Sequence, residues 1–144
     1  MRLATLAAAS SLLFAAASAD DVKAKFPIKK AVSTAVFDEK VGHQVKFFFG
    51  DPRNAPGGKS FGYASCNAKG STLKREGEDA CDWVFASCMI EMRAQADSAG
   101  ADAIVGIESI YGGKVFSSDS LFECHLGKVA SGVALRGNLI KIMK

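Results

Sequence analysis

Residues 80–107 read ACDWVFASCMIEMRAQADSAGADAIVGI, and this stretch decides the fold. Apolar residues recur at helical spacing between positions 80 and 99, which predicts an amphipathic helix. Its apolar face comprises Cys81, Val84, Phe85, Cys88, Met92, Ala96 and Ala99. We expect Asp79 to cap the start of this helix and Gly100 to end it in the left-handed conformation. The β-branched run at 103–107 then predicts a central strand.

Further strand signals lie on both sides of the helix. Segments of alternating or continuous apolar residues occur at 45–49, 61–65, 121–126 and 133–143. The last segment changes phase at Ile140 and Ile142, which indicates a bulge or a strand covered on both faces. Prolines and glycines separate the first two segments, so we expect a hairpin loop there with its turn at Gly57-Gly58.

The order of these elements predicts an α+β fold. A short helix after Pro27 precedes two strands, the long helix and three more strands. We expect a two-layer domain in which a sheet of about four to five strands packs on the long helix.

The back of the long helix is also apolar, because Trp83 and Ile90 lie there beside two alanines, Ala86 and Ala94. A helix back that faces water does not need such a surface, which we name the Trp83–Ile90 patch. Two explanations stay open. Either the short helix after Pro27 covers the patch with Ile28, Ala31, Val32 and Ala35, or a partner protein binds it.

Residues 1–19 have the pattern of a cleavable secretory signal. Arg2 precedes an apolar run too short to span a membrane, and Ala17-Ser18-Ala19 fits the small-residue cleavage pattern. We therefore expect cleavage after Ala19 and export to the periplasm or the extracellular space. No cysteine follows that point directly, so no lipid anchor is expected. Residues 20–144 have the length of a single globular domain.

Four cysteines follow the predicted signal, namely Cys66, Cys81, Cys88 and Cys124. An even count in an exported chain favours disulfides over a metal site or a redox motif. Cys81 and Cys88 lie roughly 10 Å apart along the predicted helix, at about 1.5 Å per residue, which is too far for a bond between them. Either Cys81 pairs with Cys124 and Cys66 with Cys88, or Cys66 pairs with Cys81 and Cys88 with Cys124.

An ordered set of motifs covers most of the chain. They are Val45-Lys-Phe-Phe-Phe-Gly50, Cys81-Asp-Trp-Val-Phe85, Gly100-Ala-Asp-Ala-Ile-Val105, Phe122-Glu-Cys124 and Gly132-Val-Ala-Leu-Arg-Gly137. From about Pro27 to Ile142 the chain resembles a family of small exported bacterial proteins of unknown function, often labelled "excinuclease ATPase subunit". At the level of the fold it is also similar to small heavy-metal-binding domains and to the disulfide-bonded Rcs lipoprotein that senses envelope stress.

The family resemblance implies one of the two cysteine pairings. In that family the cysteine at the start of the long helix and the one in the Phe-Glu-Cys step recur as a pair, which implies a Cys81–Cys124 bond here. Cys66 and Cys88 then remain, as a second disulfide or as two buried free thiols. Cys66 ends a predicted strand and Cys88 faces the sheet, so a bond between them is geometrically reasonable.

The family's label invites a test for a phosphate-binding loop. Gly58-Lys59-Ser60 matches the end of such a loop, but Arg53 stands where its first glycine is required. A helix must also begin at the Lys-Ser step, whereas the residues that follow predict a strand. We therefore interpret the label as a transferred name and expect no ATPase activity.

Composition and spacing argue against several other classes of function. The net charge is +3, from 18 Lys and Arg against 15 Asp and Glu, and no basic block is long enough to follow a nucleic acid backbone. His43 is expected in a polar loop and His125 is expected to point to solvent. Neither histidine forms a catalytic or metal-binding motif with the dispersed cysteines. We predict no metal, no cofactor and no catalytic residue.

The sequence thus predicts a non-catalytic, exported, disulfide-stabilised domain that binds an envelope protein or another envelope component. The Trp83–Ile90 patch is its candidate partner surface. The alternative is a soluble carrier of a metal or a small ligand. The sequence does not indicate an oligomeric state.

Overall fold

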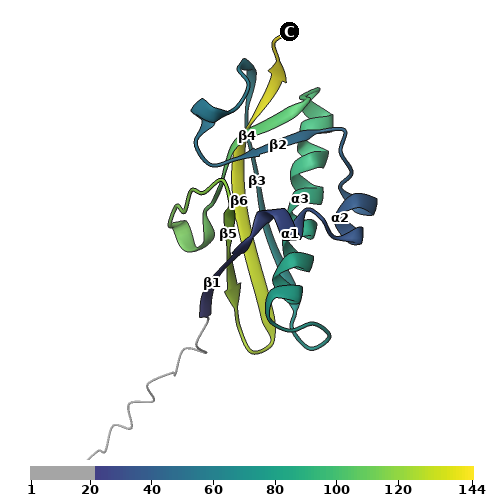
Figure 1. The fold of residues 1–144 in the computed structure, drawn as a ribbon, viewed down its shortest axis with the longest axis vertical. Coiled ribbons are helices and arrows are strands. Elements are labelled where there is room, and N and C mark those ends of the chain that lie inside the picture. Colours follow the sequence, from purple (N-terminus) through teal and green to yellow (C-terminus); the bar gives the residue numbers. More distant parts are fainter. Residues whose placement is uncertain (1–21) are drawn as a thin grey trace, which may run out of the picture.

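The computed structural model describes residues 22–144, so the predicted signal at 1–19 lies outside the described residues. In the described part a curled six-stranded sheet packs against one long helix (Figure 1). The predicted α+β class is therefore confirmed, but the number and the order of the strands differ from the prediction. None of the described helices is long and apolar enough to cross a membrane.

The elements follow one another from β1 to β6. They are β1 (Val22–Pro27), α1 (Ile28–Ala31), α2 (Ala35–Lys40), β2 (Lys46–Phe49), β3 (Gly58–Ser71), α3 (Gly77–Ala99), β4 (Ala103–Ser109), β5 (Leu121–Leu126) and β6 (Ala130–Ile142). Single 3-10 turns lie between β2 and β3, at Pro52–Asn54, and between β4 and β5, at Tyr111–Gly113.

The strand β6 organises the sheet. It pairs with β3 along its whole length on one side, and with β4 and the end of β5 on the other side. The strand β2 extends the sheet beyond β4 in parallel orientation, and β1 extends it beyond β5. The predicted hairpin between β2 and β3 is therefore wrong, since these strands pair with β4 and β6. Gly58 is not a turn residue but begins β3 opposite Ile142.

The sequence analysis did not predict β1, and it predicted one short helix where the structure has α1 and α2. Strand β1 does carry an alternating pattern, because Lys23 and Lys25 stand between the apolar residues Val22, Ala24 and Phe26. Its order comes from backbone pairing with β5 and from Phe26, whose ring centroid lies 6.2 Å from that of Phe122.

The ends of α3 differ from the prediction at the start but not at the finish. The helix begins at Gly77 after Glu76, which makes no side-chain capping bond, so Asp79 lies in the first turn and is not the cap. Gly100 ends the helix with φ 74°, a left-handed conformation that suits glycine. Ala99 is exposed, although the helical pattern assigned it to the buried face. It is the last residue of the helix, directly before the turn at Gly100.

The sheet is covered on both faces near the end of β6. Leu139 belongs to the main core under α3, whereas Ile140 packs with Ala103 and Val105 in a small second core on the other face. The phase change in this strand thus reflects burial on both faces. The register shifts lie in its partners, β3 and β4, where Gly62 and Gly106 have positive φ.

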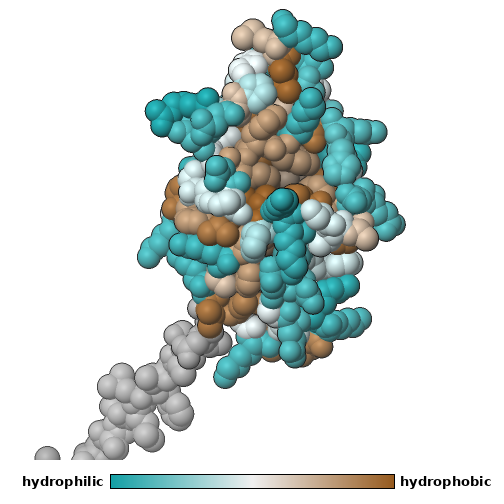
Figure 2. Space-filling view, in the orientation of Figure 1, coloured by the Kyte–Doolittle hydropathy of each residue, from teal (hydrophilic) through white to brown (hydrophobic). Residues whose placement is uncertain are grey.

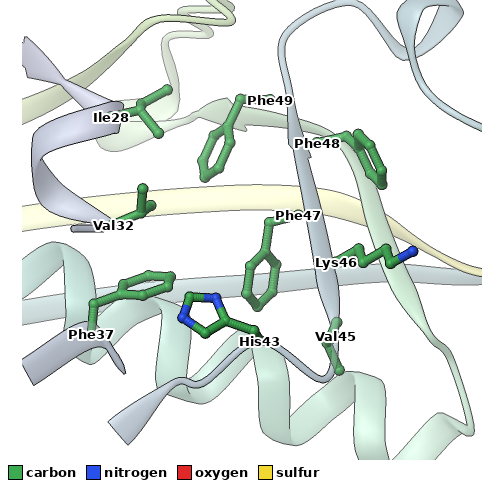
Figure 3. Close-up of a pocket in the computed structure, with 9 residues that line it drawn as sticks. All are labelled: Ile28, Val32, Phe37, His43, Val45, Lys46, Phe47, Phe48 and Phe49. Atoms are coloured by element: carbon green, nitrogen blue, oxygen red, sulfur yellow. The ribbon is translucent and has the colours of Figure 1, made fainter. Parts of the chain in front are cut away.

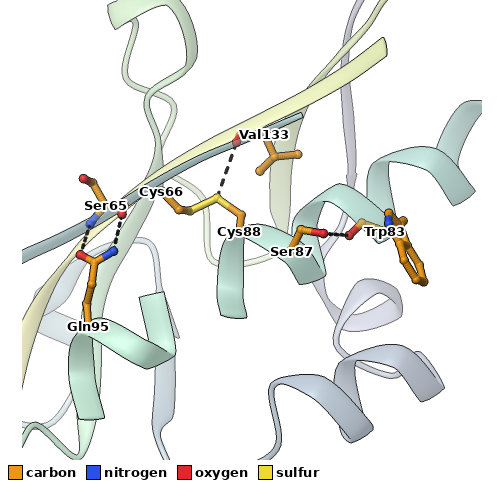
Figure 4. The surroundings of a disulfide bond; sticks show 7 residues. All are labelled: Ser65, Cys66, Trp83, Ser87, Cys88, Gln95 and Val133. Atoms are coloured by element: carbon orange, nitrogen blue, oxygen red, sulfur yellow. Dashed lines mark hydrogen bonds between the residues drawn. A yellow bond between two sulfur atoms is a disulfide. The ribbon is translucent and has the colours of Figure 1, made fainter. Parts of the chain in front are cut away.

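Two disulfides tie α3 to the sheet. Cys66 of β3 is bonded to Cys88 in the middle of α3, with a Cα–Cα distance of 5.3 Å (Figure 4). Cys81 near the start of α3 is bonded to Cys124 of β5, with a Cα–Cα distance of 6.0 Å. These are the two pairs that follow from the family resemblance, and they are compatible with an oxidising compartment.

The two disulfides predict a graded loss of stability. The Cys81–Cys124 bond closes a loop of 43 residues, so Cys81→Ala with Cys124→Ala should lower the free energy of unfolding by about 4 kcal/mol. The Cys66–Cys88 bond closes 22 residues, and its removal should cost about 3 kcal/mol in the same chain-entropy model. Urea denaturation of both double variants, each with and without a reductant, measures these losses. Equal stability of either variant and the unreduced parent protein would contradict the prediction.

Candidate binding site

A groove lies between β2 and the two short helices. Its volume is 480 Å³. Its lining is almost entirely apolar and consists of Ile28, Val32, Phe37, His43, Val45, Lys46, Phe47, Phe48 and Phe49 (Figure 3). The space-filling view shows apolar side chains gathered on this face, around β2 and α1 (Figure 2). We name this hollow the β2 groove.

The wall opposite β2 is set by how α1 and α2 begin. Pro27 ends β1 with φ −66°, and α1 starts at once with Ile28, whose backbone N–H donates to the carbonyl of Ser120 at 2.9 Å. Thr34 caps α2 by accepting from the backbone N–H of Phe37 at 3.3 Å. This cap directs Phe37 into the core, and the two helices stand beside β2 as the second wall of the groove.

Aromatic rings form the floor of the β2 groove. Phe37 meets Phe47 edge to face with 6.3 Å between ring centroids, and it stacks on Phe85 of α3 at the same separation. Phe49 also stacks on Phe85, at 5.9 Å. Ring packing thus joins the floor of the groove to α3.

The pleat of β2 separates its side chains into two sets. Phe47 and Phe49 point into the groove, whereas Lys46 and Phe48 point to the other side of the strand (Figure 3). His43 stands at the rim with its Nε2 2.8 Å from Asp38 Oδ1, in the polar loop where the sequence placed it. Lys46 and His43 supply the only ionisable side chains of the groove lining, and no acidic residue lines it.

The Trp83–Ile90 patch lies elsewhere, on the outer side of α3. The short helices α1 and α2 pack on α3, and Ala86 is buried, but Trp83 stays 40% exposed and Ile90 37% exposed. Both large residues of the patch therefore stay partly exposed beside these helices, and what covers the patch stays a prediction. The guanidinium of Arg75 lies 3.7 Å from the ring centroid of Trp83, so a charge of the same chain covers part of the indole.

A buried acid lies next to this patch. Asp82 is 5% exposed, and one of its carboxylate oxygens lies 3.4 Å from Lys30 Nζ of α1. Burial raises the pKa of Asp82 above its ordinary value, although Lys30 opposes the change. The pKa of Lys30 is raised as well, mainly by its hydrogen bond to Glu78, whose carboxylate lies 3.2 Å from Lys30 Nζ.

His125 does not point to solvent, so that expectation is wrong. Its side chain is 14% exposed, and Tyr111 stacks on it with 3.6 Å between ring centroids. Gly132 is paired with His125 and leaves room for that tyrosine, since a Cβ there would lie 2.6 Å from Tyr111 Cε2. Glu123 lies beneath, with its Oε1 3.5 Å from His125 Nε2 and 3.6 Å from Lys23 Nζ. Strand pairing brings Lys23 of β1 and Gly132 of β6 to this cluster, so the local sequence pattern did not reveal it.

The structure places the remaining predicted motifs as follows. Gly58, Lys59 and Ser60 begin β3, and the residues after them continue the strand, as the sequence indicated. In the described residues no group of three or more His, Cys, Asp or Glu side chains is arranged to hold a metal ion. All four cysteines are in disulfides.

Comparisons of this chain with protein-family models, with curated proteins and with solved structures find no match. The resemblance to the exported family therefore stays a prediction. The groove, its rings and its charges are the observations from which a function can be argued.

The environment of Asp82 predicts a pH dependence of stability. A carboxyl whose pKa is raised in the folded state stabilises the fold below its unfolded pKa, and this contribution is lost as pH rises through the folded pKa. Asp82→Asn carries no charge at any pH, so its unfolding free energy relative to the parent protein should increase as pH rises from about 3 to 7. Urea denaturation across this range measures the difference.

Asp79→Asn is the matched control for this change, because Asp79 lies at the same helix end but is exposed. An unfolding free energy of Asp82→Asn that falls relative to that of the parent protein as pH rises would contradict the interpretation of Asp82.

Proposed function

We propose that this protein is a non-catalytic, exported binding domain that holds an apolar part of an envelope protein in the β2 groove. The observation that carries the proposal is an aromatic groove of 480 Å³ that the described chain leaves open. Sites that bind other molecules are usually concave, largely apolar and of about 300–1,000 Å³.

The composition of the lining supports binding more than catalysis. It contains no Ser, Thr, Cys, Asp or Glu, and its one histidine is paired with Asp38 at the solvent-exposed rim. A hydrolytic or group-transfer site needs a nucleophile, a base and an orienting group at one point. Instead of such catalytic groups, the groove offers apolar contact area and aromatic ring faces to a bound molecule.

The two disulfides support the proposal because they hold the helix whose Phe85 packs on the groove floor. Phe85, which carries the stacked rings of the floor, lies between Cys81 and Cys88 on α3. Both cysteines are bonded to the sheet, so this part of α3 is held at two points. A floor that is already ordered loses little conformational entropy when a partner binds, which favours affinity.

A small apolar ligand is the second candidate occupant, because the volume of the groove also suits a single small molecule. The same groove then belongs to a carrier, and the two candidates differ in whether a macromolecule contacts the rim.

Photo-crosslinking tests which surface contacts a partner. Benzoylphenylalanine in place of the exposed His43, at the groove rim, should crosslink to an envelope protein when the chain is exported in cells. Val32→Asp places a charge on the groove wall, and it should weaken this crosslink about tenfold or more, because the partner must then bury an unpaired carboxylate. Quantification of the crosslinked band measures the effect.

Val36→Asp is the matched control, since Val36 is also half-buried but lies beside Trp83 and not in the groove. It should leave the crosslink unchanged, and circular dichroism should show both variants folded. If benzoylphenylalanine in place of Trp83 crosslinks to a partner, and only Val36→Asp removes that crosslink, the partner binds at the Trp83–Ile90 patch and not in the groove. A crosslink from neither position would overturn the proposal.

A further inference from the structure

The backbone of β2 is open along one edge. Lys46 and Gly50 donate their N–H groups toward β4, to the carbonyls of Asp102 and Ile107, each at 3.0 Å. Backbone groups alternate in direction along a strand, so the N–H and C=O groups of Phe47 and Phe49 point away from β4. Among the described residues β2 pairs with β4 alone, and the β2 groove lies along this free edge.

The other free edges of the sheet differ from that of β2. On β3 the side-chain amide of Gln95 takes the place of a neighbouring strand, because its Oε1 accepts from the Ser65 N–H at 3.1 Å and its Nε2 donates to the Ser65 carbonyl at 2.7 Å (Figure 4). Strand β1 carries Lys23 and Lys25, the type of residue that discourages pairing with another chain. Within residues 22–144, the edge of β2 is the one where unpaired backbone groups lie along the β2 groove.

An added strand beside β2 meets two different faces. On one face its side chains enter the groove over Phe47 and Phe49, and on the other face they lie beside Lys46 and Phe48 (Figure 3). Because the groove lining is cationic at Lys46 and contains no acid, the complementary segment is apolar on one face and acidic on the other.

We infer that β2 accepts an extended segment of a partner protein as an additional strand, with an apolar side chain in the β2 groove and a carboxylate beside Lys46. This inference rests on the proposed function and specifies its partner by chemistry. Backbone hydrogen bonds to Phe47 and Phe49 supply sequence-independent affinity, and the groove and Lys46 supply the selectivity.

The probe is an array of short capped peptides in which apolar residues alternate with threonine and one threonine is replaced by Glu, Gln or Lys. The protein purified after export should bind glutamate members about three- to fivefold more tightly than lysine members, as expected for one exposed cross-strand charge pair. N-methylation of the peptide backbone at the residues that pair with Phe47 and Phe49 should weaken binding about tenfold, because it removes hydrogen-bond donors without changing the protein.

Lys46→Glu should reverse the charge preference, whereas Lys69→Glu on the edge of β3 is the matched control and should leave it unchanged. Both lysines are exposed, so neither change disturbs the core. Strand addition would be overturned if N-methylated and parent peptides bind with equal affinity and Val32→Asp abolishes the binding of both. The proposed groove function would then stand.

Three further results overturn the inference. Binding by no member of the array excludes an extended apolar segment of this kind, and the groove crosslink then decides the proposed function separately. If a small apolar dye displaces the peptides and binds more tightly than all of them, the β2 groove is a site for small ligands. If the protein self-associates in sedimentation experiments and Val32→Asp abolishes this association, the edge of β2 binds a second copy of this chain.

Discussion

The packing of Phe85 is the interaction on which the rest of the structure depends. This ring lies fully buried on α3 and is in contact with Phe37 of α2, Phe49 of β2 and Phe122 of β5, the last with a centroid separation of 4.5 Å. Segments from four parts of the chain therefore meet on one side chain. Its surroundings place β2 opposite the short helices, and the β2 groove is the space that remains between them.

Electrostatics add a second level of organisation around α3. The acids of its first turns meet the positive end of the helix, and Lys30 of α1 lies among them, within 4.0 Å of Glu78, Asp79 and Asp82. This attachment brings α1 to the helix and so fixes the wall of the groove that Ile28 belongs to. Asp82 remains poorly solvated within it, so positioning of α1 is accompanied by an unfavourable burial of charge.

Local patterns in the sequence predict the elements well where the pattern has a strong period. The long helix, its end at Gly100 and the strands at 103–107 and 121–126 agree with the structure for this reason. Pairing partners are not local properties, so β2 was assigned to β3 when its actual partner is β4. Strand β1 was missed although Lys23 and Lys25 alternate there with apolar residues, which is a local strand signal. The β2 groove was missed because it too depends on strand pairing. Its aromatic residues were interpreted as an ordinary alternating strand, and only the parallel pairing of β2 exposes them beside α1. The sequence did identify the outer side of α3 as apolar, since Trp83 and Ile90 are spaced by two helical turns.

The interlaced pattern of the disulfides has a consequence for how such a chain acquires them. Along the sequence the cysteines come in the order Cys66, Cys81, Cys88 and Cys124, but the bonds join the first to the third and the second to the fourth. An oxidant that joins cysteines in the order in which a translocating chain delivers them would link Cys66 to Cys81. Under the proposed export, the native bonds therefore require α3 to fold onto β3 before oxidation, or a later exchange of disulfides by an isomerase. Maturation of this small domain thus depends on the timing of helix docking relative to thiol oxidation.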